Sequence, residues 1–549
     1  MGEILQETTI HRRRQKLNAM TDGLGLGDAY GATLGRIKGQ GGEKARLGMA
    51  TLMWISHSER PLEADELCHA LAVEIESLDL NADNVPSIGT LLACCQGLVV
   101  VDKKASTVRL IHFTLLEYLR AHPELFDAAH SAMAETCLSY LNSRQVKAFS
   151  TSPSPDLQNT PFLQYSSVFW GIHAKKNLSD CAKQLALKLF DDYDSHISAK
   201  ILLKAQESGM YAGDFKLPSR FSSLHCASFF GIVEIIACLV ESGRYHINQM
   251  DYAGNTPLVW AAWNGHEGAV KVLLGCGGVN PEPLDTDGRT PLCLAAESGH
   301  EGVVKILLTR DDVNPDKLDM FGRTPLCYAA EKGHEGVVEI LLGRNDVDPD
   351  TLDSDGRTPL CLAAESGHEG MVEILLGRDD VTSDKPDKFG RTPLCCAAKN
   401  GHGRVVKILL GRGDVNPDKP DMFGQTPLSL AAGNGHERVV KILLGRDDID
   451  PDKPAEDGKT PLWSAAWGGH KRVVEILLGR EDVDPNKPDV FGQTPLYCAA
   501  ANGHEGTVKM LLERDDISPD EPDTSGLTPL LCAARNGHER VVGTILEWG

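Results

Sequence analysis

Thr324-Pro-Leu-Cys-Tyr-Ala-Ala-Glu-Lys-Gly-His334 is one copy of a segment that recurs along most of the chain. Its opening triplet, Thr-Pro-Leu, returns every 34 residues, beginning at Thr256, Thr290, Thr324, Thr358, Thr392, Thr426, Thr460, Thr494 and Thr528. A fixed period of this length is typical of stacked supersecondary units, each of which buries its apolar face against its neighbours. The sequence therefore predicts a solenoid.

Each repeat is expected to form a helix, a turn, a second helix and a long loop. In the repeat at 319–352, the hydroxyl of Thr324 can cap the first helix, and Pro325 suits its first position because the missing N–H is not needed there. Gly333 ends this helix, and His334 opens a second one with helical apolar spacing. The remaining residues carry Asp and Pro, which predicts a projecting loop.

The order Thr-Pro-Leu, Ala-Ala, Gly-His, Val-Val and Leu-Leu resembles the ankyrin repeat, from about Leu217 to Gly549. A further copy, Ser222 to Ala227, lies 34 residues before Thr256, so we expect about ten repeats of 34 residues. They start near residues 217, 251, 285, 319, 353, 387, 421, 455, 489 and 523. The resemblance implies a non-enzymatic protein-interaction module that uses a concave face made of loop tips and first helices.

A different pattern precedes the repeats. It predicts helices at Lys44 to His57, Leu62 to Val73 and Asn84 to Gln96, strands at Leu98 to Val101 and Thr107 to Ile111, and a helix at His112 to Arg120. Three helices followed by a hairpin indicate a winged-helix-like domain, bounded here at 43–150. The fold class is therefore mainly α, with an N-terminal segment at 1–42, this domain, a helical connector at 151–216 and the ankyrin domain at 217–549.

The segment Leu110-Ile-His-Phe-Thr-Leu-Leu-Glu-Tyr-Leu119 resembles the end of the winged helix that follows the NACHT nucleotide-binding module in fungal NOD-like receptor proteins. Gly27 to Ile37 looks like the last helix of that upstream module, so residues 1–42 are expected to be its remnant. Ser166 to Glu207 looks like the helical connector that joins such winged helices to ankyrin arrays. The resemblance implies the sensor part of a receptor of this type.

In the resembled family, the histidine of the His-Phe-Thr motif contacts nucleotide phosphates, and it corresponds to His112. A complete receptor would hold ATP through G-x-x-x-x-G-K-[ST], whose amides surround the phosphates. The 549 residues contain no such string. We therefore favour a structural role for His112 and expect neither ATP binding nor any other cofactor.

Composition restricts the classes of partner. The formal net charge is −22 and the pI is near 5.3, which argues against nucleic-acid and anionic-membrane surfaces. No membrane span or signal peptide is recognisable, and the 15 cysteines form no C-x-x-C, so an intracellular, cytoplasmic protein is expected. The basic run Arg12 to Lys16 is a weak nuclear signal. The predicted third helix, Asn84 to Gln96, has no Lys or Arg for DNA.

Several patterns suggest chemistry that the spacing does not support. The Gly-His pairs recur about 10 Å apart, the distance between packed helices, which is too far for a shared zinc ion. The Asp-rich loops lack the ligand spacing of a calcium loop. Cys395-Cys396 and Cys94-Cys95 have no recognisable catalytic partner. We therefore expect no metal site and no catalysis.

Two positions vary most between the copies. They are the residue before the turn glycine, often Phe, and the residue after Ala-Ala, which ranges from Trp to Glu and Lys. Exposed aromatic residues on a polar background are typical interface anchors. The predicted partner-binding residues are Trp263, Phe321, Arg323, Phe389, Arg391, Lys399, Phe423, Trp467 and Phe491.

Two alternative functions stay open: part of a nucleotide-driven NTPase whose P-loop module lies outside this chain, and a DNA-binding winged-helix regulator. The two ends of the array carry further expectations. The first repeat, with Phe229, Phe230 and Ile235, should dock on the helical connector. The last repeat, with Val541, Val542, Ile545 and Leu546, lacks a polar cap and should fray or self-associate.

Overall fold

The computed structural model describes residues 26–102, 104–150, 160–206 and 220–548, and it is mainly helical, as predicted. Its contacts divide the chain into two compact units: Met1–Ala261 with Val272–Val279, and Ala262–Lys271 with Asn280–Gly549. The basic run Arg12 to Lys16 lies outside the described residues, as do parts of the predicted segments 1–42 and 151–216 and the start of the first repeat. Within these limits, no helix is both long and apolar enough to span a membrane.

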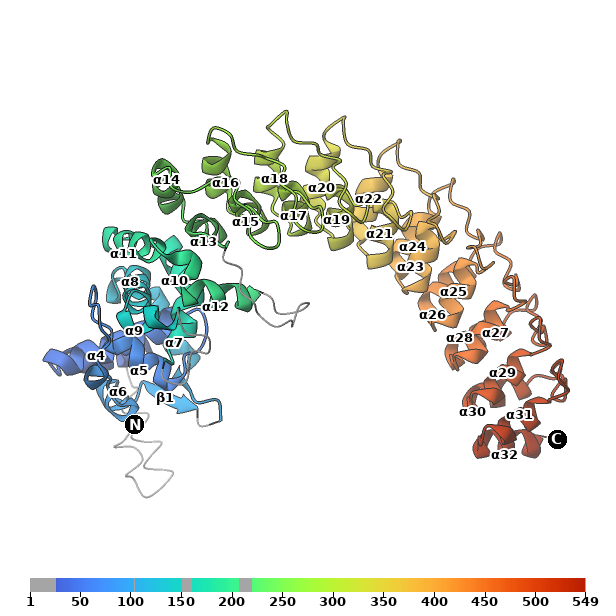
Figure 1. Ribbon diagram of the computed structural model, residues 1–549. Helices are drawn as coiled ribbons and strands as arrows, with labels where there is room; N and C mark the ends of the chain where they lie inside the picture. Colours follow the sequence, from blue (N-terminus) through green and yellow to red (C-terminus); the bar gives the residue numbers. More distant parts are fainter. Residues whose placement is uncertain (1–25, 103, 151–159, 207–219, 549) are drawn as a thin grey trace, which may run out of the picture. The chain divides into compact units, whose positions relative to one another are not determined.

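The N-terminal unit begins with the order of elements predicted for a winged helix (Figure 1). These elements are α3 (Leu26–Lys38), α4 (Gly42–His57), α5 (Ala64–Ala72), η1 (Ala82–Asn84), α6 (Ile88–Cys94), β1 (Val99–Asp102), β2 (Thr107–Leu110), α7 (Phe113–Ala121) and η2 (Pro123–Leu125). The two strands are antiparallel, and Val99 pairs with Leu110. Helix α6 starts later than the predicted Asn84, because Pro86 disfavours helix before it and Ser87 caps the new start through Thr90 N–H.

A helical connector follows. It comprises α8 (Ala129–Leu141), α9 (Arg144–Phe149), α10 (Leu163–Lys176), α11 (Asp180–Phe190), η4 (Tyr193–Ser195) and α12 (Ile197–Gln206). The predicted winged-helix domain at 43–150 includes residues 129–149, where helices α8 and α9 were not predicted. Helix α8 packs mainly on α10 and α11 instead, and its apolar residues Met133, Cys137 and Leu141 are fully buried.

The first repeat, α13 (Ser223–Phe230) and α14 (Val233–Glu241), docks on the connector, as predicted. The ring of Phe230 lies 5.2 Å from that of Trp170, centroid to centroid. It also covers Gly171, where an added Cβ would lie only 2.2 Å from the Phe230 ring. The hydroxyl of Ser223 donates a hydrogen bond to the carbonyl of Phe190 at 2.9 Å. The connector therefore buries the face that this repeat would otherwise expose.

Nine further helix pairs form the rest of the array (Figure 1). The first helices are α15 (Pro257–Trp263), α17 (Pro291–Glu297), α19 (Pro325–Lys332), α21 (Pro359–Ser366), α23 (Pro393–Lys399), α25 (Pro427–Gly433), α27 (Pro461–Trp467), α29 (Pro495–Ala501) and α31 (Pro529–Arg535). The second helices are α16 (Glu267–Leu274), α18 (Glu301–Leu307), α20 (Glu335–Leu342), α22 (Glu369–Leu376), α24 (Gly403–Leu410), α26 (Glu437–Leu443), α28 (Lys471–Leu478), α30 (Glu505–Leu512) and α32 (Glu539–Trp548). From α17 on, first helices pack on first helices and second on second.

The helix starts follow the predicted chemistry. In each of these nine repeats the threonine of Thr-Pro-Leu accepts a hydrogen bond from a backbone N–H three residues later, as Thr324 does from Cys327 at 3.3 Å. The proline occupies the first helical position. Threonine and proline together therefore fix where every first helix begins.

The Gly-His pairs join one repeat to the next. The imidazole Nε2 donates to the carbonyl 37 residues earlier, as His402 does to Glu365 at 3.0 Å and His436 to Lys399 at 2.8 Å. The ring also packs on the glycine of the preceding repeat. An added Cβ at Gly367, whose φ is +81°, would lie 2.4 Å from His402 Nδ1. The expected structural role of these histidines is confirmed.

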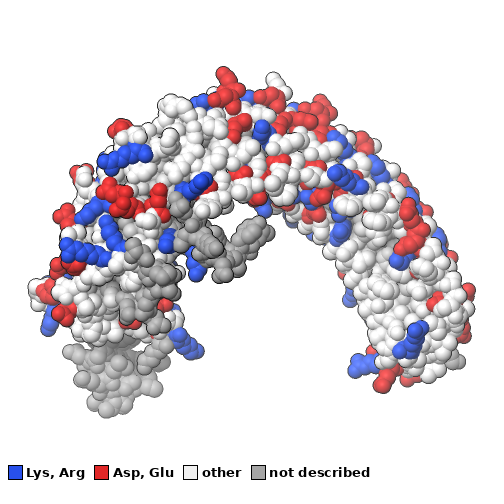
Figure 2. Space-filling model, in the orientation of Figure 1, with Lys and Arg blue, Asp and Glu red and all other residues white. Residues whose placement is uncertain are grey.

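Charged side chains add a second connection between repeats. Arg378 Nη1 donates to the carbonyl of Leu342 at 2.6 Å, while the rest of its guanidinium pairs with Asp380. The same arrangement recurs at Arg344, Arg412, Arg446, Arg480 and Arg514. Figure 2 shows basic and acidic side chains interleaved over the visible surface of the repeats. Much of the loop charge thus stabilises the stack.

Replacing Gly367 with Ala should destabilise the array by at least about 2 kcal/mol, because a left-handed backbone disfavours a side chain and the new Cβ would displace His402. Urea denaturation followed by circular dichroism measures the loss. Gly413→Ala is the matched control, since nothing lies within 4 Å of a Cβ at that glycine. Equal midpoints for the two variants would contradict the proposed contact.

Candidate protein-binding groove

The six aromatic residues predicted to contact a partner are all exposed. Their exposed fractions are 38% for Trp263, 50% for Phe321, 41% for Phe389, 56% for Phe423, 50% for Trp467 and 58% for Phe491. Large apolar side chains at this exposure contribute little to the core. The expectation that they lie outside the packed stack is confirmed.

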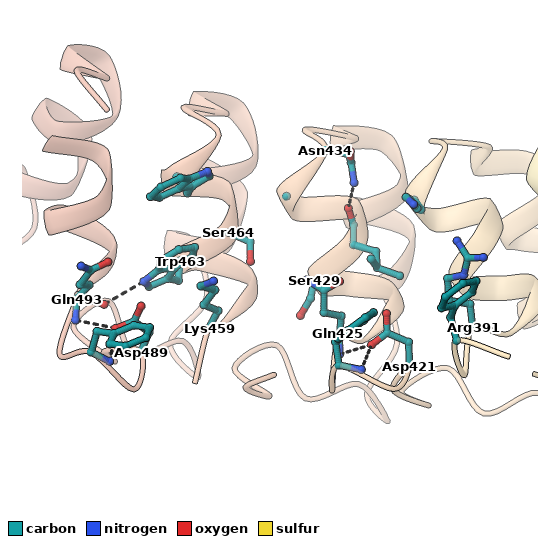
Figure 3. Close-up of a pocket in the computed structure, with 17 residues that line it drawn as sticks. Arg391, Asp421, Gln425, Ser429, Asn434, Lys459, Trp463, Ser464, Asp489 and Gln493 are labelled. Carbon is teal, nitrogen blue, oxygen red and sulfur yellow. Dashed lines mark hydrogen bonds between the residues drawn. The ribbon is translucent and has the colours of Figure 1, made fainter. Parts of the chain in front are cut away.

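Six of the nine predicted partner-binding residues line a single groove of about 900 Å³, which runs along the repeats that start near 387, 421, 455 and 489. These six are Phe389, Arg391, Lys399, Phe423, Trp467 and Phe491. Figure 3 shows the other polar side chains of the groove, from first helices and from the turns before them, among them Asp421, Gln425, Asp489 and Gln493. We call this set of residues the 389–493 groove.

The structure separates the other three predicted residues from this groove. Phe321 and Arg323 line a smaller hollow of about 390 Å³, together with Tyr328 and several charged side chains. There Arg323 pairs with Glu331 at 3.0 Å, so its guanidinium is already neutralised. Trp263 lines neither cavity, and its carbonyl accepts the hydrogen bond of His300.

Trp463 forms part of the groove and was missed by the sequence analysis. Its ring is stacked on that of Trp467, with centroids 5.5 Å apart and an interplanar angle of 7°. Its Nε1 donates to the carbonyl of Gln493 at 3.0 Å, and the ammonium of Lys459 lies 4.7 Å from the ring centroid. Trp463 follows Thr-Pro-Leu, a position filled by Cys in four other repeats, so the sequence marks it as a core residue. Its second role, which is to support the ring of Trp467 in the groove, was indicated in the sequence by the spacing of four residues between the two tryptophans.

One repeat shows how the groove holds a guanidinium group. Arg391 bonds Asp387 through Nε at 2.8 Å and Nη2 at 2.7 Å, both to Oδ2. Its Cζ also lies 4.9 Å from the centroid of the Phe389 ring. The charge is therefore held between a carboxylate and an aromatic face, both of which favour a cation.

The chain matches the models of two protein families. The family of ankyrin repeats, as three-copy units, matches residues 170–285, 277–350, 337–421, 412–489 and 480–549, and the chain belongs to this family. The winged-helix domain of GPI inositol-deacylase matches residues 37–132. The ankyrin match begins in α10, before the predicted boundary at 217. A search of curated proteins found no match. Ankyrin repeats are modules of protein–protein interaction.

His112 has a structural contact in the winged-helix region. It is the N-cap of α7, where its Nδ1 accepts from Thr114 N–H at 3.3 Å. The hydroxyl of Thr114 bonds Tyr30 Oη at 2.7 Å, which joins α7 to α3. These bonds agree with the structural role favoured from the sequence.

A histidine cluster joins the winged-helix region to the connector. His173 Nδ1 lies 2.8 Å from His130 Nδ1, and its Nε2 lies 2.9 Å from the Tyr165 hydroxyl. With Glu59, these two imidazoles bring ligand atoms within 4.8 Å of one another, a set that a metal ion could use. Both nitrogens of His173 already have partners, and Lys176 pairs with Glu59 at 2.5 Å. A metal would therefore have to displace the proton between the two imidazoles.

Acid should destabilise the N-terminal unit. Burial lowers the pKa of His173 to about 3, and the pKa values of His130, His196 and His225 to about 4, against an ordinary 6.5. The unfolded chain therefore binds more protons than the folded one between about pH 6.5 and 4. Stability from these groups is complete above pH 6.5 and falls as the pH drops toward 4.

Hydrogen exchange between pH 7 and 4.5, corrected for the intrinsic rate, checks this prediction. Amides of α8, α10 and α13 should lose protection before those of α21 to α26. The second unit serves as the internal reference. Loss of protection at the same pH in both units would contradict the assignment to these histidines.

Proposed function

We propose that the chain is a protein-recognition module whose 389–493 groove binds a segment of a partner protein. The observation that carries the proposal is the convergence of six predicted partner-binding residues on one groove, five of them at the two positions that vary most between repeats. Aromatic residues within a polar surround are typical of binding hot spots. In this function the chain acts by binding and needs no cofactor or metal.

We further propose that the module is the sensor part of a fungal NOD-like-receptor-type protein, acting in the cytoplasm. The support is the winged-helix match, because that type of domain is NACHT-related, and its order before an ankyrin array. In this proposal the P-loop NTPase is encoded outside the given sequence. Sequencing the transcript upstream of the Met1 codon tests it, since an open frame with G-x-x-x-x-G-K-[ST] is required.

A winged-helix DNA regulator remains the competing function. Helix α6, Ile88–Cys94, corresponds to the helix that reads DNA in such domains and has no basic residue. Titration of duplex DNA at two salt concentrations separates the candidates. Submicromolar, strongly salt-dependent binding would favour the DNA regulator.

The recognition function is tested by comparing two forms of the full chain as bait in cell extracts. The native chain should retain proteins that the Phe423→Ala/Phe491→Ala variant loses. A protein that qualifies is then purified, and its affinity for both forms is measured by calorimetry. Equal affinity for both forms would remove the 389–493 groove as the binding site.

Replacing Phe389 or Phe423 with Ala should weaken binding of that partner by about 1 to 2 kcal/mol each. The thermal transition should stay nearly unchanged, because both rings are exposed and contribute little to the core. Calorimetric titration and a thermal melt are measured on the same samples. A large loss of stability would instead place the rings in the stack.

Self-association through the last repeat is a separate proposal. The expectation that Val541 and Ile545 are exposed with Leu546 is wrong, because both are buried in the last repeat. Leu531, Leu546 and Trp548 are 52%, 63% and 47% exposed. Covering such side chains contributes about 1.5 to 3 kcal/mol each. Leu546→Glu should therefore lower the average mass seen by light scattering, whereas Leu318→Glu, at a loop residue that is 49% exposed, should not. A monomer at all concentrations with the native chain would contradict the proposal.

A further inference from the structure

Eight of the nine repeats that start near residues 251 to 523 have an aspartate at their first position, and its two oxygens have different roles; the repeat at 455 has Ala455 there. In Asp421, Oδ1 accepts the backbone N–H groups of Phe423 and Gln425, both at 2.9 Å. Asp489 makes the same pair of bonds to Phe491 and Gln493. This oxygen shapes the turn before the first helix, so the other oxygen, Oδ2, is left for a side chain.

In most repeats this side chain comes from the same repeat or, for Asp523, from the repeat before it. Arg289, Arg357 and Arg391 donate through Nε to Oδ2 of Asp285, Asp353 and Asp387 at 2.9, 3.0 and 2.8 Å. The ring donors Trp260, Tyr328 and Tyr497 do so to Asp251, Asp319 and Asp523. A carboxylate that is removed from water is thus given a charged or polar partner.

Asp421 and Asp489 differ from the others. Glutamine stands in the place of the arginine in both repeats, as Gln425 and Gln493. Among the described residues, no side chain donates to Oδ2 of either aspartate, although the residues are only 8% and 6% exposed. Both line the 389–493 groove, as Figure 3 shows.

The repeat with Asp387 supplies the template for what these carboxylates bind. There a guanidinium lies between the carboxylate of Asp387 and the ring of Phe389. The sequence Asp-x-Phe recurs at Asp421 and Asp489. Without an arginine over them, Phe423 and Phe491 are 56% and 58% exposed, against 41% for Phe389. The same pair of carboxylate and ring is present twice more in the groove, open to a cation from outside.

Resting on the proposed function, we propose that the 389–493 groove takes an extended segment of a partner protein that carries two basic residues, one for Asp421 and one for Asp489. Arginine suits these sites best, because its planar guanidinium can bond the carboxylate and stack on the ring together. The two aspartates are two repeats apart, on the order of 20 Å. An extended peptide spans that distance with about six residues.

The other charged residues of the groove also favour binding of the partner's basic residues at Asp421 and Asp489. Arg391 is paired with Asp387, and Lys459 with Asp457 at 2.7 Å. Lys399, at the end of the groove nearest Phe389, makes no ion pair within the described part of the chain. Its ammonium would repel a basic side chain there. The basic residues of the partner are therefore directed to the two aspartates.

A library of random 12-residue peptides displayed on phage tests the inference with the full chain as target. Selection should enrich pairs of Arg or Lys five to seven residues apart. Synthetic copies of the selected peptides should bind the Asp421→Asn and Asp489→Asn variants at least about tenfold more weakly, because a charge-assisted hydrogen bond is lost. Asp285→Asn, at an aspartate outside the groove, should bind as the native chain does.

Gln425→Arg and Gln493→Arg test the inference more directly than the Asp→Asn variants, because they leave both carboxylates in place. Each introduces the arginine that four other repeats carry at this position, so the fold should tolerate it, while the carboxylate becomes occupied from within. Both should lose at least about tenfold in affinity with unchanged thermal unfolding. Full affinity in the two arginine variants, selection of peptides without basic pairs, or no selected peptide at all would overturn the inference.

The variants Phe423→Ala and Phe491→Ala distinguish failure of the inferred preference for basic residues from failure of the proposed binding function. Peptides that lose affinity for Phe423→Ala or Phe491→Ala but bind both arginine variants fully would keep the groove as a binding site and overturn its preference for basic residues. If peptides and protein partners bind the Phe423→Ala and Phe491→Ala variants with full affinity as well, both the proposed function of the groove and its preference for basic residues would be overturned.

Discussion

The array depends on one contact, the histidine of each repeat against the glycine of the repeat before it. The imidazole packs where a glycine side chain would be, and its Nε2 donates to a main-chain carbonyl of the same preceding repeat, as His402 does to Glu365. Helices of seven or eight residues are too short to be stable alone, so their stability comes from such contacts between repeats. Because this contact specifies only a glycine, a histidine and a main-chain carbonyl, it leaves the other side chains at the joint free to vary.

The two variable positions owe their freedom to the main chain. The residue after Ala-Ala gives its carbonyl to the next histidine, whatever its side chain is: Glu365 and Lys399 serve equally. The residue before the turn glycine gives its carbonyl to a backbone N–H of the next repeat, as Phe389 does to Met422 at 2.8 Å. Backbone atoms hold the stack, while the side chains at these positions are exposed. Binding residues can therefore change without loss of the fold.

The period, the helix boundaries within each repeat, the winged-helix order and the exposure of the aromatic residues could all be predicted from the sequence, because local patterns encode them. The groove could not. Its assembly from Phe389, Lys399, Trp467 and Phe491 depends on the stacking of repeats, which periodicity does not describe. Trp463 was missed because one residue can fill a core position and support a surface ring. The packing of α8 on α10 and the cluster of His130 and His173 join segments whose distance along the chain gave no signal.

The turn aspartate shows how a structural residue can also become a binding residue. Its Oδ1 has the same role in shaping the turn at Asp387, Asp421 and Asp489, so the carboxylate serves the fold in each of these repeats. What differs is whether the chain also occupies Oδ2. Replacing arginine by glutamine four residues later leaves the turn intact and changes only the partner of the second oxygen. An array of near-identical repeats can thus place a charge on its surface at chosen points by omitting a neutralising residue, with no new acidic residue.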